Sequence, residues 1–568
     1  MLQEDKKMPE KLRFCFNIDA SNDTFFQGKT SCLPFTRSDS ICNEENIRQQ
    51  FNAITSYIDA SNVYGSDPET ADKLRSKSDG KMTTNYLGPA LPTRGQCKFE
   101  NAHEESFDDL VGGDVRAIEQ PALAGMHSLF ISEHNRIAEL LKENVPEAND
   151  EEIYQVSRKI LGAEFQNVVY DEFLPIVLGN KTMEKYRLAL PYDNEEGSDY
   201  NSSVVASISN EFATVAYRFG HSLIPNQLLH SHNPIRSSKM SCPLHQHFFT
   251  FDEFVLGTDK SGKGWQNMMD GLQYQESPKM DASVANNVRD FLFCNGNCSL
   301  PGGHGQDLAA RNIQRGRDHG LQPYLKFREF CNLSIPDNWF TRPEDVSEQY
   351  WRNLQKVYRN VSDIDPFPGG LSESAVEGGL VGETFACIIG LQFARLKEGD
   401  RFFFTNPENG SKGEMGLPRR AKEAIRKRKL GDIICDNTDL ENISPEVMRM
   451  TGKDQQRSCE AGNKLIYSDI LELLPTESPV PSPVPVPVLT PVPSPVPAPV
   501  PSPVPAPVPS PVPSPVPSPA PSQVPVPVPS PVPVPFPSPV PTPDPVQAPS
   551  VAVPDPVQAP SVPAPDPV

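Results

Sequence analysis

The sequence predicts one large, mainly α-helical domain followed by a proline-rich tail, and three observations lead to this expectation. Several segments place apolar residues at helical spacing, strong β alternation is scarce, and proline is concentrated towards the C-terminus. The segment from Ser128 to Leu141 shows the helical spacing, with Leu129, Ile131 and Ile137 on roughly one face. We expect further helices over residues 152–169, 211–224 and 382–396, and from Ala310 onward.

The proline-rich tail begins near Pro475, and most of the 62 prolines of the chain lie within it. Its Pro-Val, Pro-Ser-Pro-Val and Pro-Ala-Pro-Val units offer no periodic apolar face and few backbone donors, so the tail cannot bury a core. We therefore predict an atypical N-terminus over residues 1–14, a helical domain over residues 15–470 and a disordered tail over residues 471–568. The tail has no basic flank of the kind that many SH3 or WW ligands use, so we favour a spacer or stalk with no assigned partner.

The composition excludes some classes of partner. A formal net charge of −21 argues against nucleic acid and anionic membranes. No run of about 18 apolar residues occurs, so we predict no membrane span. The first residues, MLQEDKKMPEKLRF, are charged and contain no apolar stretch, so we predict no signal peptide. We favour an N-terminally incomplete product as the explanation.

The cysteines and the glycosylation sequons indicate an oxidising compartment. The 11 cysteines are scattered and mostly lack zinc-finger spacing. The N-x-S/T sequons of a secreted glycoprotein occur at Asn22, Asn180, Asn201, Asn297, Asn332, Asn360 and Asn409. Each sequon alone is a weak signal, and together with the cysteines they favour secretion.

His221 is the first candidate for chemistry. It follows an apolar helical stretch, and Arg218 lies one turn before it. A neutral imidazole in such a place can ligate a metal or a haem iron if an acceptor holds its other nitrogen. A hydrogen-bonded core histidine is the commoner alternative, and this segment alone leaves both open.

The segment from Arg311 to Tyr324, RNIQRGRDHGLQPY, is too charged for an ordinary core helix. Arg315 or Arg317 could pair with carboxylates such as haem propionates. An ion-pair network with Asp318 explains the segment equally well.

Arg116 and Glu119 are three residues apart, so one helical turn would place them on the same side. An arginine over a reactive centre can stabilise developing negative charge, and a carboxylate can take part in proton transfer. A surface salt bridge is the commoner arrangement at this spacing.

The loop TSYIDASNVYGS presents oxygen ligands at every second residue, from Thr55, the carbonyl of Tyr57, Asp59 and Ser61. An extended loop would bring these oxygens to one side, as Ca²⁺ requires. One carboxylate is few for calcium, so a second would have to come from elsewhere. An edge strand with a hydroxylated face is the alternative.

In their order and spacing, these segments resemble animal haem peroxidases of the myeloperoxidase and eosinophil peroxidase kind. The resemblance covers about residues 15–460. It rests on TSYIDASNVYGS, GGDVRAIEQPALAGMHSLFISEHNRIA, EFATVAYRFGHSLI, NIQRGRDHG and GGLVGETFACIIGLQFARLKEGDRFFF, followed by DIICDNT. The fold that it implies is the large, mainly α, single-domain fold of this family.

The resemblance implies roles around a haem b. His221 would be the fifth ligand of the iron, with Asn312 accepting a hydrogen bond from its other ring nitrogen. Arg116 would polarise bound peroxide. Glu119 would form an ester to the haem, the only covalent link expected, because Gln120 stands where myeloperoxidase has the methionine of a further bond.

Other residues gain supporting roles from the same resemblance. Arg218 and Arg315 would anchor the edge of the haem, and the loop oxygens of Thr55, Tyr57, Asp59 and Ser61 would bind Ca²⁺. The resemblance also makes three disulfides plausible: Cys331 with Cys387, Cys435 with Cys459, and Cys15 with Cys32.

The chain departs from the family at one important place. The family has an Asp-His-Asp motif upstream of the calcium loop, and its histidine is the distal acid-base group. No such triplet occurs in this sequence. Loss of a positioned general base typically costs on the order of 10²- to 10⁴-fold in rate. His103, His127 and His134 are nearby in the sequence, but nothing in it places them over an iron.

The resemblance implies a peroxidase that uses H₂O₂ to oxidise halide, thiocyanate or aromatic donors, outside the cell or in a secretory granule. We expect this activity to be impaired in the chain as written. The alternative is a non-catalytic, haem-binding or structural pseudo-peroxidase whose tail recruits partners. Cyclooxygenase-like chemistry is a weaker third hypothesis, because no membrane-binding amphipathic segment is apparent.

Overall fold

The computed structural model describes one helical unit that contains all the candidate residues. It describes residues 15–42, 47–98, 110–191, 198–230, 240–250, 252–257, 259–294, 302–451 and 455–474. The predicted tail lies outside these residues except for its first four. There, Leu471–Leu473 form a 3-10 turn and Leu474 is buried, so the described core reaches slightly beyond the predicted boundary at residue 470.

The described residues are mainly helical, as predicted. The α-helices are α1 (Ser61–Tyr64), α2 (Pro68–Leu74), α3 (Pro121–Asn144), α4 (Asp150–Val168), α5 (Leu174–Lys185), α6 (Asn210–Thr214), α7 (Gly264–Leu272), α8 (Asn286–Arg289), α9 (Leu308–Asp318), α10 (Tyr324–Phe330), α11 (Glu348–Val357), α12 (Pro366–Leu371), α13 (Glu383–Glu398), α14 (Arg419–Lys427), α15 (Leu430–Asn437) and α16 (Tyr467–Ile470). Shorter 3-10 or π turns include Val169–Phe173, Ala216–Leu223, Leu244–Gln246, Asp252–Leu256, Val361–Asp363 and Cys459–Ala461.

Strands are few and short, as the scarcity of β alternation predicts. The described residues form two-stranded antiparallel pairs: β1 (Ile18–Asp19) with β2 (Cys32–Leu33), β3 (Ser40–Cys42) with β4 (Arg48–Gln50), β5 (Gln227–His230) with β6 (Met240–Pro243), and β7 (Asn442–Ile443) with β8 (Arg457–Ser458). None of the described helices is both long and apolar enough to cross a membrane.

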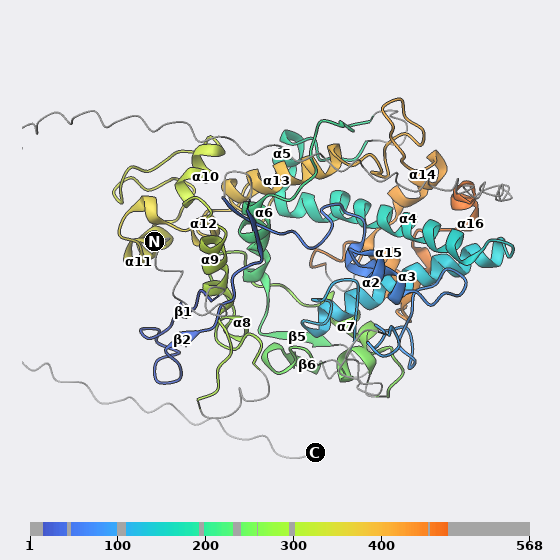
Figure 1. Ribbon diagram of the computed structural model, residues 1–568, viewed down its shortest axis with the longest axis horizontal. Coiled ribbons are helices and arrows are strands. Elements are labelled where there is room, and N and C mark those ends of the chain that lie inside the picture. The colour runs from blue at the N-terminus through green and yellow to red at the C-terminus, as the bar shows by residue number, and fades with distance from the viewer. Residues whose placement is uncertain are drawn as a thin grey trace, which may run out of the picture. The chain divides into compact units, whose positions relative to one another are not determined.

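The long helices α3 and α4 pack against each other and carry much of the core (Figure 1). α3 begins where the side chain of Gln120 accepts a hydrogen bond from the Ala122 amide, with Pro121 at the first helical position. α4 begins with a capping box between Asn149 and Glu152. The buried residues of both helices recur at the helical period, so each helix turns one apolar stripe towards the core.

The predicted helix over residues 211–224 is interrupted, which corrects one expectation. α6 ends at Thr214, and the chain continues as a 3-10 helix, Ala216–Leu223. Val215 between them has φ −131° and ψ −74°, so it is not helical. The apolar period looks continuous because Phe212, Val215, Ala216 and Phe219 are all buried.

A buried ion network joins α3, α4 and the C-terminal helices. Arg428 is 1% exposed and donates to Glu164 at 2.6 Å, to Asp436 at 2.8 Å and to Glu133 at 2.9 Å. Arg136 also pairs with Glu133 at 2.6 Å. Burial and the charge of Glu133 raise the pKa of Glu164. A single guanidinium therefore holds helices that are far apart in the sequence.

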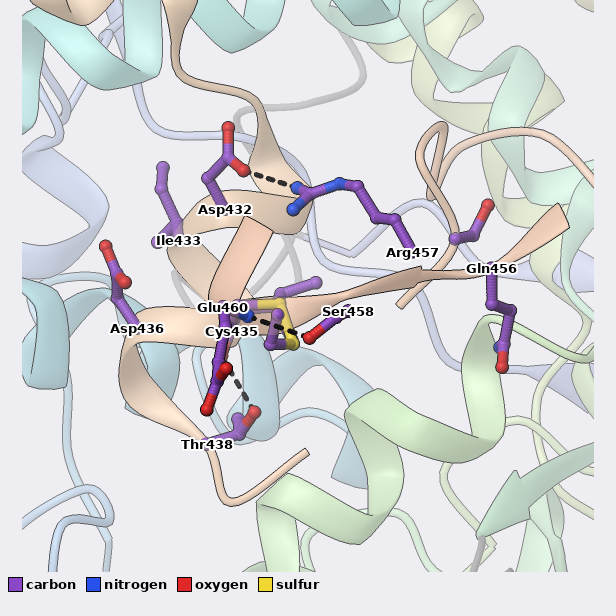
Figure 2. Close-up of a disulfide and its surroundings, with 12 residues drawn as sticks. Asp432, Ile433, Cys435, Asp436, Thr438, Gln456, Arg457, Ser458 and Glu460 are labelled. Carbon is purple, nitrogen blue, oxygen red and sulfur yellow. Dashed lines mark hydrogen bonds and ion pairs between the residues drawn. A yellow bond between two sulfur atoms is a disulfide. The ribbon is translucent and has the colours of Figure 1, made fainter. Parts of the chain in front are cut away.

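Two of the three expected disulfides are formed, Cys331–Cys387 and Cys435–Cys459. Figure 2 shows the second bond, which lies beside the ion pair between Asp432 and Arg457.

The expected bond between Cys15 and Cys32 is not formed, which corrects the third pairing. Cys15 is opposite Thr36, and Cys32 is opposite Asp19 on the neighbouring strand. This register sets the two cysteines about four positions apart along the pair, roughly 13 Å at the usual rise per residue, whereas disulfides need Cα atoms within about 7 Å.

His134 on α3 is a structural histidine in the core. Its Nδ1 accepts from the Tyr64 hydroxyl at 2.7 Å, and its Nε2–H donates to the Gly80 carbonyl at 2.8 Å. Burial lowers the pKa of His134 to about 4. The ring is therefore neutral in the folded protein.

We expect His134 to make the protein less stable in acid. Its folded pKa of about 4 lies below the unfolded value of about 6.5, so the unfolded chain binds one proton more between these pH values. The free energy of unfolding should then fall as pH decreases from 6.5 towards 4, by at most about 1.4 kcal/mol per pH unit.

Urea unfolding of the wild-type chain and His134→Gln at several pH values checks this, since glutamine can keep both hydrogen bonds but does not titrate. The free energy of unfolding of the wild-type chain should fall relative to that of the variant as the pH falls through this window. A difference that does not depend on pH would show that His134 is not the group that titrates.

Candidate functional site

His221 lies in the 3-10 helix Ala216–Leu223, facing α9. Its Nδ1 is 2.7 Å from the amide nitrogen of Asn312, which is fully buried on α9. Within the described part of the chain, no hydrogen bond is made to the Nε2 of His221. Burial, followed by the charge of Arg218, lowers the pKa of His221 to about 4, so the imidazole is neutral at neutral pH. A neutral imidazole can ligate a metal through the ring nitrogen that carries no proton.

Arg218 hydrogen-bonds Asn312, and the charges of Arg116 and Glu119, just before α3, act on it. Its guanidinium donates to Asn312 Oδ1 at 2.9 Å and to the Ala213 carbonyl at 3.1 Å. Burial and then the charges of other arginines, Arg315 first, lower the pKa of Arg218 to about 10. The amide of Asn312 therefore presents its oxygen to Arg218 and its nitrogen to His221, the reverse of the orientation that the resemblance implies.

Arg116 and Glu119 lie in the turn that leads into α3. Burial raises the pKa of Glu119, and the charges of Arg116 and Arg218 oppose this rise. The Glu119 carboxylate makes no hydrogen bond to any residue that the structure describes. Arg116 is 62% exposed and pairs with Asp114 through two hydrogen bonds of 2.8 and 2.7 Å.

Asp114 was not singled out from the sequence. Its only signal there is its place two residues before Arg116, and many surface aspartates share such a spacing. In the structure, the pair with Arg116 lowers the pKa of Asp114. Asp114 thus fixes the direction of the guanidinium.

A cavity of about 530 Å³ opens beside Arg116. Its wall is mainly apolar, with Ile54, Leu110 and Ile118 on it. Its charged residues have both signs, because Asp67 and Asp114 line it as well as Arg94 and Arg116.

Arg315 takes part in the ion pair with Asp318 that the sequence left open as one alternative, and it makes further contacts. Its Nη1 donates to the Thr36 carbonyl at 3.0 Å, to Ser38 Oγ at 3.0 Å and to Asp318 at 2.8 Å. Its guanidinium also lies 4.1 Å from the centre of the Phe35 ring. Arg315 therefore holds the segment between β2 and β3 against α9, and it acts on Arg218 through its charge.

The structure brings together the side-chain oxygens of the predicted calcium loop. Thr55 Oγ1 donates to Asp59 Oδ1 and is 3.0 Å from both that atom and Ser61 Oγ. Tyr57 is exposed. Asp400 is a second carboxylate that interacts with this loop. Burial is the main cause that raises the pKa of Asp400 to about 6, and the charge of Asp59 adds to the rise. No cluster of three or more His, Cys, Asp or Glu that could hold a metal occurs among the described residues.

The calcium loop region and the Arg116 turn touch through their backbones. The Asp114 amide donates to the Asn62 carbonyl at 3.1 Å. A Cβ at Gly113 would lie 2.3 Å from the Gly65 nitrogen and 2.7 Å from the Ser61 carbonyl oxygen. Only glycine allows this approach. The Gly112-Gly113 pair in the sequence was the available signal.

The residues fit a haem group in two respects. His221 offers a neutral imidazole, and its Nε2 has no hydrogen-bond partner among the described residues. The charges acting on Arg218 are mainly positive, from Arg315, Arg116 and Arg311 against Glu119, so the site favours a ligand with carboxylates. The fold is that of a mainly helical protein, and these residues would suit a cofactor that a histidine ligates and that carries carboxylates.

The family model described as animal haem peroxidase matches residues 2–448. The chain belongs to the animal haem peroxidase family. This agrees with the resemblance and with the helical fold expected from the sequence.

Similar proteins include both short and long peroxidases. The chain is 36% identical to mouse myeloperoxidase over 454 residues, which is 76% of this chain and 59% of that protein. It is 34% identical to a Caenorhabditis briggsae peroxidasin homolog over 476 residues, 78% of this chain and 35% of that protein. The chain thus spans between about a third and three fifths of the length of these relatives.

Solved structures share the fold. Peroxidase A from Dictyostelium discoideum matches with a TM-score of 0.63 at 27% identity, covering 76% of this chain and 82% of that one. A fatty acid alpha-dioxygenase from Oryza sativa matches with a TM-score of 0.60 at 21% identity, covering 79% and 74% of the two chains, which shows a common fold only.

Proposed function

We propose that this chain is a haem-dependent peroxidase whose activity is reduced. The observation that carries the proposal is the neutral, half-buried His221 held by Asn312, with Arg116 and Glu119 within electrostatic reach of the adjoining Arg218. The haem, when bound, would supply the oxidation chemistry with H₂O₂ as oxidant. The proposed donors are halide, thiocyanate or aromatic compounds, and the proposed location is extracellular or in a secretory granule.

The residues of this chain would have separate roles in binding the haem and Ca²⁺. His221 would bind the iron through Nε2. Arg218 would pair with a haem carboxylate, and Arg315 would support it, given its existing contact with Asp318. Glu119 is the one residue proposed to form a covalent link to the haem. The Thr55, Asp59 and Ser61 oxygens, with the carbonyl of Tyr57, would bind Ca²⁺.

The reduced activity follows from the lack of an evident base. The printed sequence has no Asp-His-Asp triplet. His134 is occupied by Tyr64 and Gly80, and His127 donates to the Leu123 carbonyl at 2.9 Å and lies 3.4 Å from the Asn62 amide. His103 lies outside the described residues. The same observations support a second candidate function, a haem-binding pseudo-peroxidase.

Stopped-flow absorbance of the haem-reconstituted chain tests the proposal. The wild-type chain should show a Soret band that changes on mixing with H₂O₂, roughly 10²- to 10⁴-fold more slowly than expected with a positioned base. His221→Ala should lose the band. A stable band that ignores peroxide would favour the pseudo-peroxidase, and a band that survives in His221→Ala would refute the ligand assignment.

We expect Arg116→Gln to slow the reaction with H₂O₂ by roughly 10²-fold, because a charged donor to the developing negative oxygen is lost. The measurement is the second-order rate constant from the same stopped-flow traces. Arg419→Gln, on the exposed face of α14, is the matched control and should react like the wild-type chain. Equal rates for all three proteins would mean that Arg116 does not act on the peroxide.

A further inference from the structure

Asn312 is held between a cation and an imidazole. Its Oδ1 accepts from Arg218 Nη1 at 2.9 Å, and its Nδ2 lies 2.7 Å from His221 Nδ1. The side chain of Asn312 is fully buried, so no solvent competes for these contacts. A guanidinium can only donate, so the amide oxygen must face Arg218 and the amide nitrogen must face His221.

This orientation fixes the tautomer of the histidine. The amide nitrogen donates, so His221 Nδ1 must accept, and the ring proton then lies on Nε2. A nitrogen that carries a proton has no lone pair available for a metal. The contact between Arg218 and Asn312 therefore holds His221 in the form that does not ligate iron.

We propose that Arg218 is a positioning residue that controls haem capture through the orientation of Asn312. While Arg218 donates to Asn312, Nε2 of His221 keeps its proton. When a ligand carboxylate takes the donors of Arg218, the amide can turn over and accept from Nδ1–H. The proton is then lost from Nε2 and gained at Nδ1, with no net change in charge. This inference rests on the proposed role of His221 as the haem ligand.

The supporting contacts make Arg218 suitable for such an exchange. Besides Asn312, Arg218 donates to the Ala213 carbonyl, a neutral acceptor at 3.1 Å. The other nearby charges are mainly arginines, so a carboxylate would be a stronger partner for Arg218 than a neutral amide oxygen. Haem binding would then be coupled to the tautomer change.

The test is the tautomer of His221 in the haem-free full chain, read from long-range proton–nitrogen NMR spectra of isotope-labelled histidine. His221→Gln identifies the signal. In the wild-type chain the proton should be on Nε2. In Asn312→Asp the side chain offers only acceptors to both neighbours, so the proton should move to Nδ1. Arg218→Met should give a mixture of the two tautomers.

Arg311→Met is the matched control. It removes a cation that acts on Arg218, but Arg311 contacts the Pro34 carbonyl and Gln306 rather than Asn312. His221 in Arg311→Met should have the same tautomer as in the wild-type chain. A second readout is the rate of Soret-band formation on adding haem, which should be about tenfold higher in Asn312→Asp, because the competent tautomer is already populated.

A proton on Nδ1 in the haem-free wild-type chain would overturn the inference, and so would an unchanged tautomer in Asn312→Asp. Arg311→Met behaving like Arg218→Met would also overturn it, since charge alone would then explain the effect. If the tautomers change as expected but no protein takes up haem, the proposed function and the capture role fail, while the control of His221 by Arg218 stands.

Discussion

Replacing Arg428 with methionine should destabilise the fold by about 3–5 kcal/mol, the range seen when one partner of a buried ion pair is removed. Arg428 is 1% exposed and is the common partner of Glu133, Glu164 and Asp436. The loss would be largest at Glu164, because its Oε2 has no hydrogen-bond partner among the described residues. Urea unfolding followed by circular dichroism measures the change.

The control is Arg419→Met, which removes an exposed pair with Glu423 and should cost at most about 0.5 kcal/mol. Adding Glu164→Gln to Arg428→Met should restore part of the lost stability, because the uncompensated charge disappears. Lower pH should do the same, since a buried carboxyl with a raised pKa is stabilised as it binds a proton. A loss below about 1 kcal/mol for Arg428→Met would contradict the central role of this guanidinium.

Removing the Cys331–Cys387 disulfide by a double alanine substitution should cost about 4 kcal/mol, because the bond closes a separation of 56 residues in the unfolded chain. The bond joins the end of α10 to α13. Urea unfolding under non-reducing conditions measures the loss. The wild-type chain with a reductant should approach the stability of the variant.

The Cys435–Cys459 bond provides the comparison within the same chain. It closes only 24 residues, so the corresponding double substitution should cost less, about 3 kcal/mol. If removal of the shorter closure costs more, native-state contacts rather than chain entropy decide the contribution of these bonds.

Local patterns were sufficient to predict the helical fold and most of its longer helices. The apolar spacing from Ser128 to Leu141 lies within α3, and the predicted helix over residues 382–396 is nearly α13. The break at Val215 was not predictable, because a short 3-10 segment with the same buried residues has the same apolar pattern. The pairing of Cys15 with Cys32 failed because strand register depends on partners elsewhere in the chain.

The candidate residues could be named from the sequence, but their contacts could not. Arg218 and Asn312 are 94 residues apart and form one hydrogen-bonded unit. Arg315 was expected at the haem edge, and its contacts with Thr36 and Ser38 come from the segment between β2 and β3, 277 to 279 residues away in the sequence. Long-range contacts of this kind leave no periodic pattern.

The loop at residues 55–61 and the turn that carries Arg116 are in direct backbone contact at Gly113. A Cβ at position 113 would clash with the backbone of Gly65 and Ser61, so this close approach depends on glycine. A cation bound by the loop, as proposed, and a ligand bound near Arg116 would both act on this contact. If one of them shifts it, thermodynamic reciprocity requires that each binding event change the affinity of the other by the same factor.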